Sequence, residues 1–293
     1  MCDYSVFPAD GGIIDRFDKY VSSWVFNLEF GRLDYPLSVV GMWFGIPIFA
    51  ICLLPLLLVH LVLYASASVL FSSVVLLLGL LALSIWIYLI RTKQLMTVYA
   101  VKRDPLAALL VLAHALCSLV PGGLSLCCCY YSSYAFTQTF ILAGKIAAHR
   151  KRPGLALANQ LQRLVRYVPQ ATYLGKVGWT MFESFPSGDT AGSVVFCYVI
   201  YRATGCFEIF AFVMMAAFGR MYFWAHHFLD VVAGGGIAIL TCYALETMVG
   251  PWSAFGPQHS VALTIFVIVG GKQVVKYRLP LPKHLDDGIE HFK

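Results

Sequence analysis

Residues 219–249 read GRMYFWAHHFLDVVAGGGIAILTCYALETMV, with one Arg, two His and one Asp at the edge of a long apolar run. Ionisable side chains near hydrocarbon depth are costly, so they face a polar cavity, pair with one another and mark a functional site. The run from about 229 to 249 is long enough to cross a bilayer, which takes roughly 20 apolar residues. This stretch therefore predicts a membrane helix with a functional site at its beginning.

The composition of the whole chain indicates a multi-pass membrane protein. Of its 293 residues, 59% are hydrophobic and 12% are charged, and the mean hydropathy is +0.75. Soluble domains carry about 25% charged residues. The basic residues behind the net charge of +6 are scattered through short loops. This scatter argues against a nucleic-acid partner and favours membrane lipids or phosphate.

The apolar pattern divides the chain into three regions. In residues 1–35, apolar side chains between positions 13 and 28 recur at three- and four-residue steps. This pattern predicts an amphipathic helix that lies in the membrane interface. Residues 36–278 form the transmembrane domain, and residues 279–293 form a polar tail. The start of the chain has no basic segment followed by an apolar core, so we expect no signal peptide.

Breaks in the apolar pattern divide the transmembrane domain into eight predicted spans. Two lie within 36–92 with a turn near Ala65, two lie within 105–148 with a turn at 121–123, and four follow near 190–204, 206–222, 229–249 and 260–277. The expected fold class is therefore all-α, a polytopic transmembrane bundle of about six core helices with extra spans. The longest connection, from 149 to 185, is basic and polar, and loops of this length tend to be functional.

The charge distribution favours a cytosolic position for the site. With eight spans, the N-terminus, the loops at 91–104 and 149–185, the junction around residue 226 and the tail fall on one side. That side holds nearly every Lys and Arg, and cytosolic loops carry such an excess. One miscounted span reverses the assignment, and the pattern does not identify the membrane.

The nine cysteines have no spacing that suggests a zinc site. Five lie in apolar segments and are interpreted as small hydrophobic residues: Cys52, Cys117, Cys197, Cys206 and Cys242. The consecutive residues 127–129 leave two interpretations open, palmitoylation near the membrane surface or packing at a helix end.

The first of three charged clusters combines Lys145, Arg152 and Pro153 at the end of a predicted span. In a helix, positions 145 and 152 share one face about two turns apart. Pro153 ends the helix and helps to fix the approach of the Arg152 guanidinium. A simple basic cluster that extends to the membrane surface gives the same pattern.

The second cluster opens the next span with Phe-Pro-Ser-Gly-Asp-Thr, residues 185–190. Ser187, Gly188 and Asp189 supply a cap, exposed amide groups and the positive end of a helix dipole, which together favour anion binding. An ordinary helix N-cap gives the same sequence pattern.

The third cluster holds Arg220, His226 and Asp230. The i, i+4 spacing of His226 and Asp230 allows the carboxylate to accept the imidazole N–H, which leaves the other ring nitrogen free to attack an electrophile. A buried histidine beside a helix-capping aspartate is the alternative. We expect the neighbouring His227 to be interfacial and not catalytic.

The conjunction of the clusters is more specific than any one of them. In order, K-x6-R-P, P-S-G and R-x5-H-x3-D resemble the signature of the type 2 phosphatidic acid phosphatase and haloperoxidase superfamily. The flanking apolar segments are similar to the membrane branch of that family, the lipid phosphate phosphatases.

The resemblance implies a mechanism that needs no metal and no cofactor. The residues that it implies for holding the phosphate oxygens are Lys145, Arg152, Ser187, Gly188 and Arg220. It implies that His226 attacks phosphorus to give a phosphohistidine, that Asp230 orients His226, and that water then releases phosphate.

Two positions depart from the family pattern. Gly219 stands where the third motif usually has Ser, and Asp189 stands where the second motif usually ends in His. In the family that His donates a proton to the leaving alcohol. Asp189 therefore either acts as the acid, or the substrate is a diphosphate whose leaving group needs less protonation, or the protein binds phospholipid head groups without turnover.

The expected function is a membrane lipid phosphatase. Its substrate is a phosphorylated lipid of the phosphatidate, sphingoid-base phosphate or isoprenoid diphosphate class. The alternatives are a lipid phosphotransferase on the same scaffold and a non-catalytic lipid-binding or transport protein. The oligomeric state is left open.

Overall fold

The computed structural model describes residues 12–31, 54–63, 77, 103–148, 150, 184–222 and 225–261. These residues contain helices and no strand. The elements are α1 (Ile13–Phe26), α4 (Leu54–Leu63), α6 (Arg103–Ser118), α7 (Gly123–Ala148), α9 (Gly188–Thr204), η4 (Phe207–Phe210), α10 (Ala211–Tyr222), α11 (Phe228–Val249) and η5 (Trp252–Ala254). The predicted all-α class is confirmed over these residues.

The helix boundaries follow the turn and cap signals of the sequence. The break expected at 121–123 separates α6 from α7, and Gly122 adopts a positive φ of 76° there. Ser187 caps the N-terminus of α9, and Gly205, at φ 75°, ends it in the left-handed conformation that glycine favours. The predicted spans within 36–92 and near 260–277 lie mostly outside the described residues, as do most of the 149–185 loop and the whole tail.

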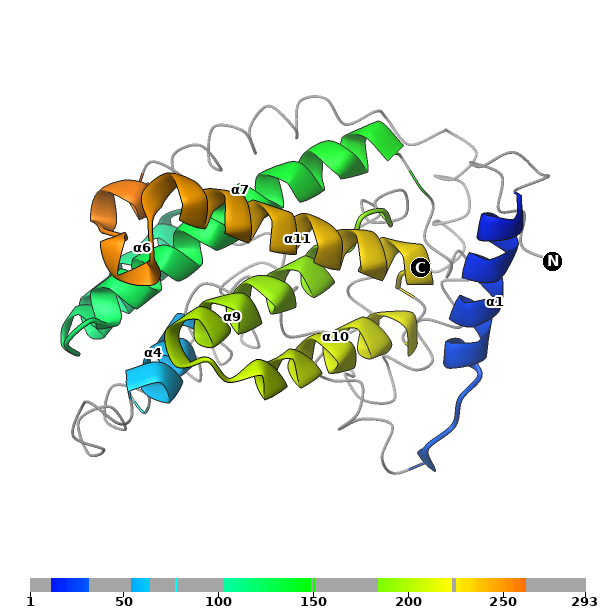
Figure 1. The fold of residues 1–293 in the computed structure, drawn as a ribbon, viewed down its shortest axis with the longest axis horizontal. Helices are drawn as coiled ribbons and strands as arrows, with labels where there is room; N and C mark the ends of the chain where they lie inside the picture. The colour runs from blue at the N-terminus through cyan, green and yellow to red at the C-terminus, as the bar shows by residue number, and fades with distance from the viewer. Residues whose placement is uncertain are drawn as a thin grey trace, which may run out of the picture.

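Helix α9 lies at the centre of the described bundle. It packs against α7, α10, α11 and α4. Figure 1 shows α7, α9, α10 and α11 running alongside one another, with α1 standing across one end of them. Most residues of α9 are buried, including Ala191, Val195 and Cys197, which are fully inaccessible to solvent. The helix is apolar on every side because it is surrounded by other helices.

Among the described residues, α11 is the helix that is long and apolar enough to cross a membrane, and α4 is a shorter apolar helix. The side of α11 that faces away from the bundle carries exposed apolar side chains: Val232, Ile239, Leu240, Tyr243 and Met248. One such helix is a weak indication of membrane association. The predicted count of eight spans therefore stays a prediction.

Among the cysteines that the structure describes, all but one are packed inside the bundle. Cys127 and Cys128 are fully buried in α7 and Cys129 is 7% exposed, so helix packing is the correct interpretation and palmitoylation of this run is wrong. Cys117, Cys197 and Cys242 are also buried, as expected. The prediction for Cys206 is wrong, because this residue is exposed in the connection between α9 and η4.

A close approach of α11 to the start of α9 depends on one glycine. A Cβ atom on Gly234 would overlap the carbonyl oxygen of Ser187, and the Ser187 nitrogen would lie 3.2 Å from it. The obstacle is backbone, which cannot rotate away as a side chain can. Gly236, two residues further along α11, has nothing within 4 Å of the same position.

We expect Gly234→Ala to destabilise the protein by about 1–3 kcal/mol, because the new methyl group forces α11 away from α9. The matched control is Gly236→Ala, which we expect to be neutral or stabilising by up to about 1 kcal/mol, because alanine favours helix over glycine. Thermal unfolding of both variants in detergent measures the difference. Equal stability of the two variants would contradict the close approach.

Candidate active site

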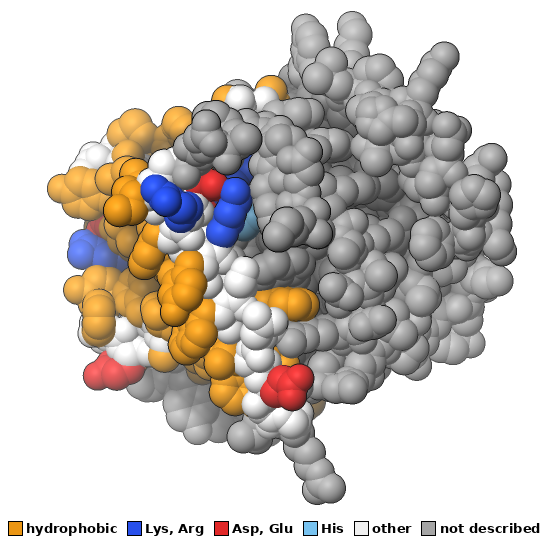
Figure 2. All heavy atoms as spheres, turned by 90° about the vertical axis from the view of Figure 1, so that its right-hand side faces the viewer, with side chains coloured by type: hydrophobic (Ala, Val, Ile, Leu, Met, Phe, Trp, Pro, Cys, Tyr) orange, Lys and Arg blue, Asp and Glu red, His pale blue; other side chains and the backbone are white. Residues whose placement is uncertain are grey.

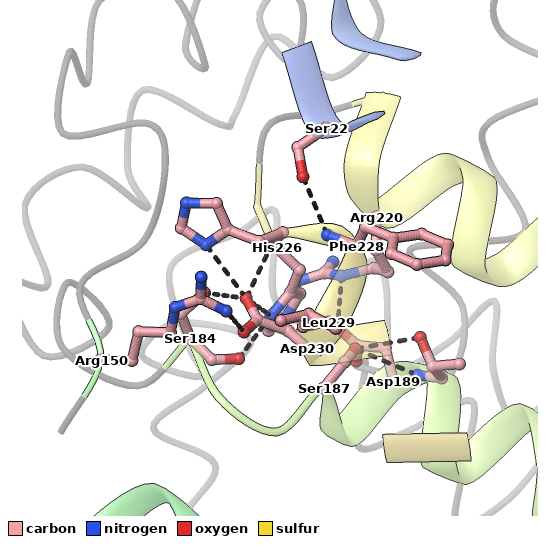
Figure 3. Close-up of polar contacts among 12 residues, drawn as sticks. Ser22, Arg150, Ser184, Ser187, Asp189, Arg220, His226, Phe228, Leu229 and Asp230 are labelled. Atoms are coloured by element: carbon pink, nitrogen blue, oxygen red, sulfur yellow. Dashed lines mark hydrogen bonds and ion pairs between the residues drawn. The ribbon is translucent and has the colours of Figure 1, made fainter. Parts of the chain in front are cut away.

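The second and third charged clusters come together where α11 begins, and Arg150, which follows the helix that carries Lys145, joins them. Asp230, in the first turn of α11, is the residue that they share (Figure 3). Its side chain contacts Arg150, which follows the first cluster's helix, and its backbone carbonyl accepts a hydrogen bond from the amide of Ser187 in the second cluster, at 2.9 Å. Segments separated by 80 positions in the chain thus meet at one buried carboxylate.

The first cluster is described only in part. Helix α7 ends at Ala148, so Lys145 lies in its last turn and Arg150 lies beyond the helix. Beyond the helix, the backbone carbonyl of Arg150 accepts a hydrogen bond from the Ser184 amide at 3.0 Å. Lys145 is partly exposed, and Arg152 lies outside the described residues.

Arg150, two residues after the end of α7, is directed into the bundle. Its guanidinium donates to Asp230 Oδ1 at 2.6 Å and to Asp18 Oδ2 at 2.5 Å. Only 5% of Arg150 is exposed, and both carboxylates are fully buried. Burial lowers the pKa of the Arg150 guanidinium, but Asp230 and Asp18 more than offset this effect and raise that pKa above its ordinary value. Arg150 therefore stays charged and balances two buried anions.

The second cluster forms the N-terminus of α9, as predicted. The Ser187 hydroxyl accepts a hydrogen bond from the Thr190 amide at 3.4 Å and contacts the Thr190 hydroxyl at 3.0 Å. The carbonyl of Gly188, the first residue of α9, accepts from the Gln138 side chain of α7 at 3.2 Å. Pro186 packs so closely on α7 that a Cβ on Gly144 would lie 2.8 Å from its ring. The helix end is therefore fixed between α7 and α11.

Asp189, the residue that departs from the family pattern, pairs with Arg220. The Arg220 Nε lies 2.8 Å from Asp189 Oδ2, and both side chains are partly exposed, at 14% and 13%. A guanidinium that is predicted to hold phosphate is thus in contact with an anion of the protein itself. A substrate phosphate that binds Arg220 either shares the Arg220 guanidinium with Asp189 or displaces the Asp189 carboxylate from it.

His226 is held in the tautomer that a nucleophile needs. Its Nδ1 lies 2.6 Å from the backbone carbonyl oxygen of Ser184. Because a carbonyl oxygen only accepts, Nδ1 carries the proton and Nε2 keeps its lone pair. The Asp230 carboxylate is further away, at 3.7 Å from Nδ1. The predicted fixing of the tautomer is present, but the nearest acceptor is Ser184 and not Asp230.

Asp230 acts on His226 largely through its neighbours. Its Oδ2 accepts hydrogen bonds from the Ser184 hydroxyl and, at 2.8 Å, from the His227 amide. The first bond holds Ser184, whose carbonyl orients His226, and the second closes one half of a capping box at the start of α11. The two backbone amides of Ala225 and His226 donate to the Arg220 carbonyl at 3.0 and 3.3 Å, which ties Arg220 to the same loop.

The prediction that His227 is interfacial is wrong. His227 is 3% exposed, and its Nδ1 lies 3.4 Å from Asp230 Oδ2. It is the N-cap residue of α11, and the turn that places His226 beside Ser184 also directs His227 inward.

Three residues of this site are not indicated by the sequence motifs: Asp18, Arg150 and Ser184. Arg150 was overlooked because it stands between two other basic residues, and Ser184 acts mainly through its backbone carbonyl. Asp18 lies in α1, on a helix whose charges were attributed to the membrane interface. The sequence does place Asp18 on one helical face with Ser22 and Val25, but it does not say that this face is buried.

The family comparison agrees with the assembled motifs. Residues 122–253 match the family model described as the PAP2 superfamily. This segment belongs to the PAP2 superfamily. The resemblance recognised from the three motifs is confirmed, and the family indicates a phosphatase-type enzyme that acts on phosphate esters. No curated protein and no solved structure matched the chain.

The PAP2 segment contains all the residues of the three motifs, including Arg152. It begins just before α7 and ends at η5. The central helix α9 and the helices α7, α10 and α11 that pack against it therefore lie within the matched residues. Helix α1 and its residue Asp18 lie outside the matched residues.

We expect Arg150→Met to destabilise the PAP2 segment by about 3–5 kcal/mol, because it leaves two buried carboxylates without their cation. The matched control is Arg202→Met. Arg202 pairs with Glu246 at 2.5 Å, but its side chain is 48% exposed, so we expect a loss of about 0–1 kcal/mol. Unfolding in detergent, followed by circular dichroism, measures both. Similar losses would contradict the role of Arg150.

Proposed function

We propose that the protein is an integral membrane lipid phosphatase that hydrolyses a phosphate monoester or diphosphate of a lipid through a phosphohistidine intermediate. The observation that carries the proposal is the hydrogen bond between His226 Nδ1 and the Ser184 carbonyl at 2.6 Å. It leaves Nε2 unprotonated for attack, next to the last turn of α10, which carries Arg220. A buried histidine that merely fills space does not require this arrangement together with the phosphate-binding motifs.

The proposed reaction has two steps. His226 Nε2 forms a bond to phosphorus while the bond from phosphorus to the leaving oxygen breaks. In a monoester that oxygen takes a proton from Asp189 or from water and leaves as the alcohol, and in a diphosphate it leaves as the lipid monophosphate. Water then attacks phosphorus, the bond to Nε2 breaks, and inorganic phosphate leaves. Lys145, Arg152 and Arg220, with the Ser187 hydroxyl and the Gly188 amide, would hold the phosphate oxygens and stabilise the charge that develops on them.

The surface of the bundle supports a lipid environment. Soluble monomers rarely expose a large contiguous apolar surface. Here α11, α10 and α1 all carry exposed large hydrophobic side chains. On the side of the molecule where α1 lies, hydrophobic side chains cover much of the described surface, with Lys or Arg and an acidic side chain among them (Figure 2). We propose that several of the helices, including α11, cross the membrane.

The amphipathic helix predicted in the N-terminal region supports the same proposal. Helix α1 exposes Ile13, Phe17, Tyr20 and Trp24 along one side, and more than half of each of these residues is accessible to solvent. These positions recur at three- and four-residue steps. We propose that this side of α1 rests in the membrane interface.

The decisive experiment is phosphate release by purified protein in mixed micelles with phosphatidate, a sphingoid-base phosphate or an isoprenoid diphosphate. We expect His226→Ala to lower the rate on the preferred lipid by about 10³-fold or more. His259→Ala is the matched control, because His259 follows the opposite end of α11, roughly 30 Å away by the rise of a 22-residue helix.

Three outcomes of this experiment are informative. Equally low release by wild type and His226→Ala on every lipid would reject the enzyme and favour the non-catalytic lipid-binding alternative. Transfer of labelled phosphate to an added alcohol, in place of free phosphate, would identify the phosphotransferase alternative. Acid-labile label on the wild-type protein, absent in His226→Ala, is the expected result for the phosphohistidine.

We expect Asp189→Asn to lower KM by about fivefold, because removal of a negative charge a few ångströms from the phosphate is worth about 1 kcal/mol even in water. Glu208→Gln is the control, since Glu208 lies in η4 on the connection between α9 and α10. The effect on kcat across pH tests the acid role. A lower kcat on monophosphates alone means that Asp189 protonates the leaving alcohol, and an unchanged kcat excludes this role.

A further inference from the structure

Helix α1 has a polar face that is fully buried against the active site. Asp18 and Ser22 are one helical turn apart, and both are inaccessible to solvent. Val25 continues this face and packs with Met221, Tyr222 and Val231 of α10 and α11. A carboxylate is costly to bury unless it is paired and hydrogen-bonded, so the partners of Asp18 explain its position.

Asp18 has two sets of partners, and both belong to the site. Its Oδ2 accepts from the Arg150 guanidinium at 2.5 Å, and its Oδ1 accepts from the Leu229 amide at 2.8 Å. The Ser22 hydroxyl accepts from the Phe228 amide at 2.9 Å and donates to the Asp18 carbonyl at 2.6 Å. Figure 3 shows Ser22 directed at the Phe228 amide beside the residues that surround Asp230.

Helix α1 therefore supplies the N-terminal caps of α11. The first amides of a helix have no partner within it and need caps. In α11 the first two, those of Phe228 and Leu229, donate to side chains of α1, more than 200 positions away in the sequence. These amides follow His226 by two and three residues, so the caps fix the backbone from which the proposed nucleophile projects.

We propose that α1 is a positioning element of the catalytic site, in which Asp18 holds Arg150 against Asp230 and, with Ser22, fixes the start of α11 next to His226. The proposal rests on the proposed function of that site. Asp18 does not touch the substrate in this scheme. It acts through Arg150 and Asp230, and through Asp230 on Ser184, whose carbonyl orients the His226 ring.

The ion pairs of Arg150 indicate what changes when the charge of Asp18 is removed. Arg150 is shared between two carboxylates, so neither of its terminal nitrogens is left to turn toward the substrate without breaking an ion pair. If Asp18 is neutralised, Arg150 keeps one carboxylate and the Leu229 amide keeps a weaker acceptor. The Asp18 carboxylate then no longer holds Arg150 and the start of α11 together. His226 loses its fixed orientation, while the phosphate-binding residues stay in place.

The test compares Asp18→Asn with Asp15→Asn in the full-length protein. Asp15 lies about one turn earlier on α1 and pairs with Lys19 at 2.6 Å, so the two variants remove the same charge from the same helix. We expect Asp18→Asn to lower kcat by about 10- to 100-fold per folded molecule, without a rise in KM, because misplacement of a reacting group costs rate rather than binding. We expect Asp15→Asn to match wild type.

A milder pair keeps the test valid if Asp18→Asn fails to fold. Ser22→Ala removes one cap of α11, and Ser23→Ala changes a neighbouring serine whose side chain does not face the site. We expect a lower kcat for Ser22→Ala alone. Wild-type kcat per folded molecule in both Asp18→Asn and Ser22→Ala would overturn the proposal.

A second readout does not depend on turnover. In protein labelled with ¹⁵N-histidine, the resonance lost in His226→Ala is that of His226, and in wild type we expect its shifts to report a proton on Nδ1. We expect Asp18→Asn to give a mixture of tautomers and Asp15→Asn to give the wild-type spectrum. If wild type hydrolyses no lipid, the proposed function fails, and this spectrum still decides the positioning role. Identical spectra for all three proteins would refute it.

Discussion

The site depends on the hydrogen bonds to one buried carboxylate. Asp230 accepts from the Arg150 guanidinium, the Ser184 hydroxyl and the His227 amide. A buried anion is stable only when its oxygens are satisfied, so each donor has to be held in place. This requirement fixes the end of α7, the segment before α9 and the turn before α11 relative to one another. The geometry of His226 follows from it, because the Ser184 carbonyl is positioned by the same bonds.

The described site has a buried part and a partly exposed part. His226, Asp230, Ser187 and Arg150 are buried, whereas Lys145, Asp189 and Arg220 remain partly accessible. In a buried environment the hydrogen bonds that set the histidine tautomer are not exchanged with water. In the partly exposed region, charged groups can pair with one another and still receive an anion from outside. The proposed nucleophile is thus rigid, and the proposed phosphate-binding groups are accessible.

The sequence predicted those features that depend on local spacing. The apolar runs and the turn residues at 121–123 and 185–190 predict the helices α6, α7, α9 and α11. The motif spacing indicates His226 and Asp230 as site residues. The role of Arg150 could not be predicted, because spacing does not say whether a cation in a basic run is buried. Asp18 could not be assigned, since an amphipathic pattern does not reveal which helix end its charged face will meet. Long-range partners of this kind are fixed only by packing.

The sequence separation between α1 and α11 also determines when the hydrogen-bond network between them can form. Asp18 and the Leu229 amide are 211 positions apart, so α1 leaves the ribosome long before the amides that it caps exist. During that interval the Asp18 carboxylate lacks the Leu229 amide as a partner. The start of α11 therefore reaches its final geometry only after α11 has been synthesised, which makes assembly of the candidate site a late event in folding.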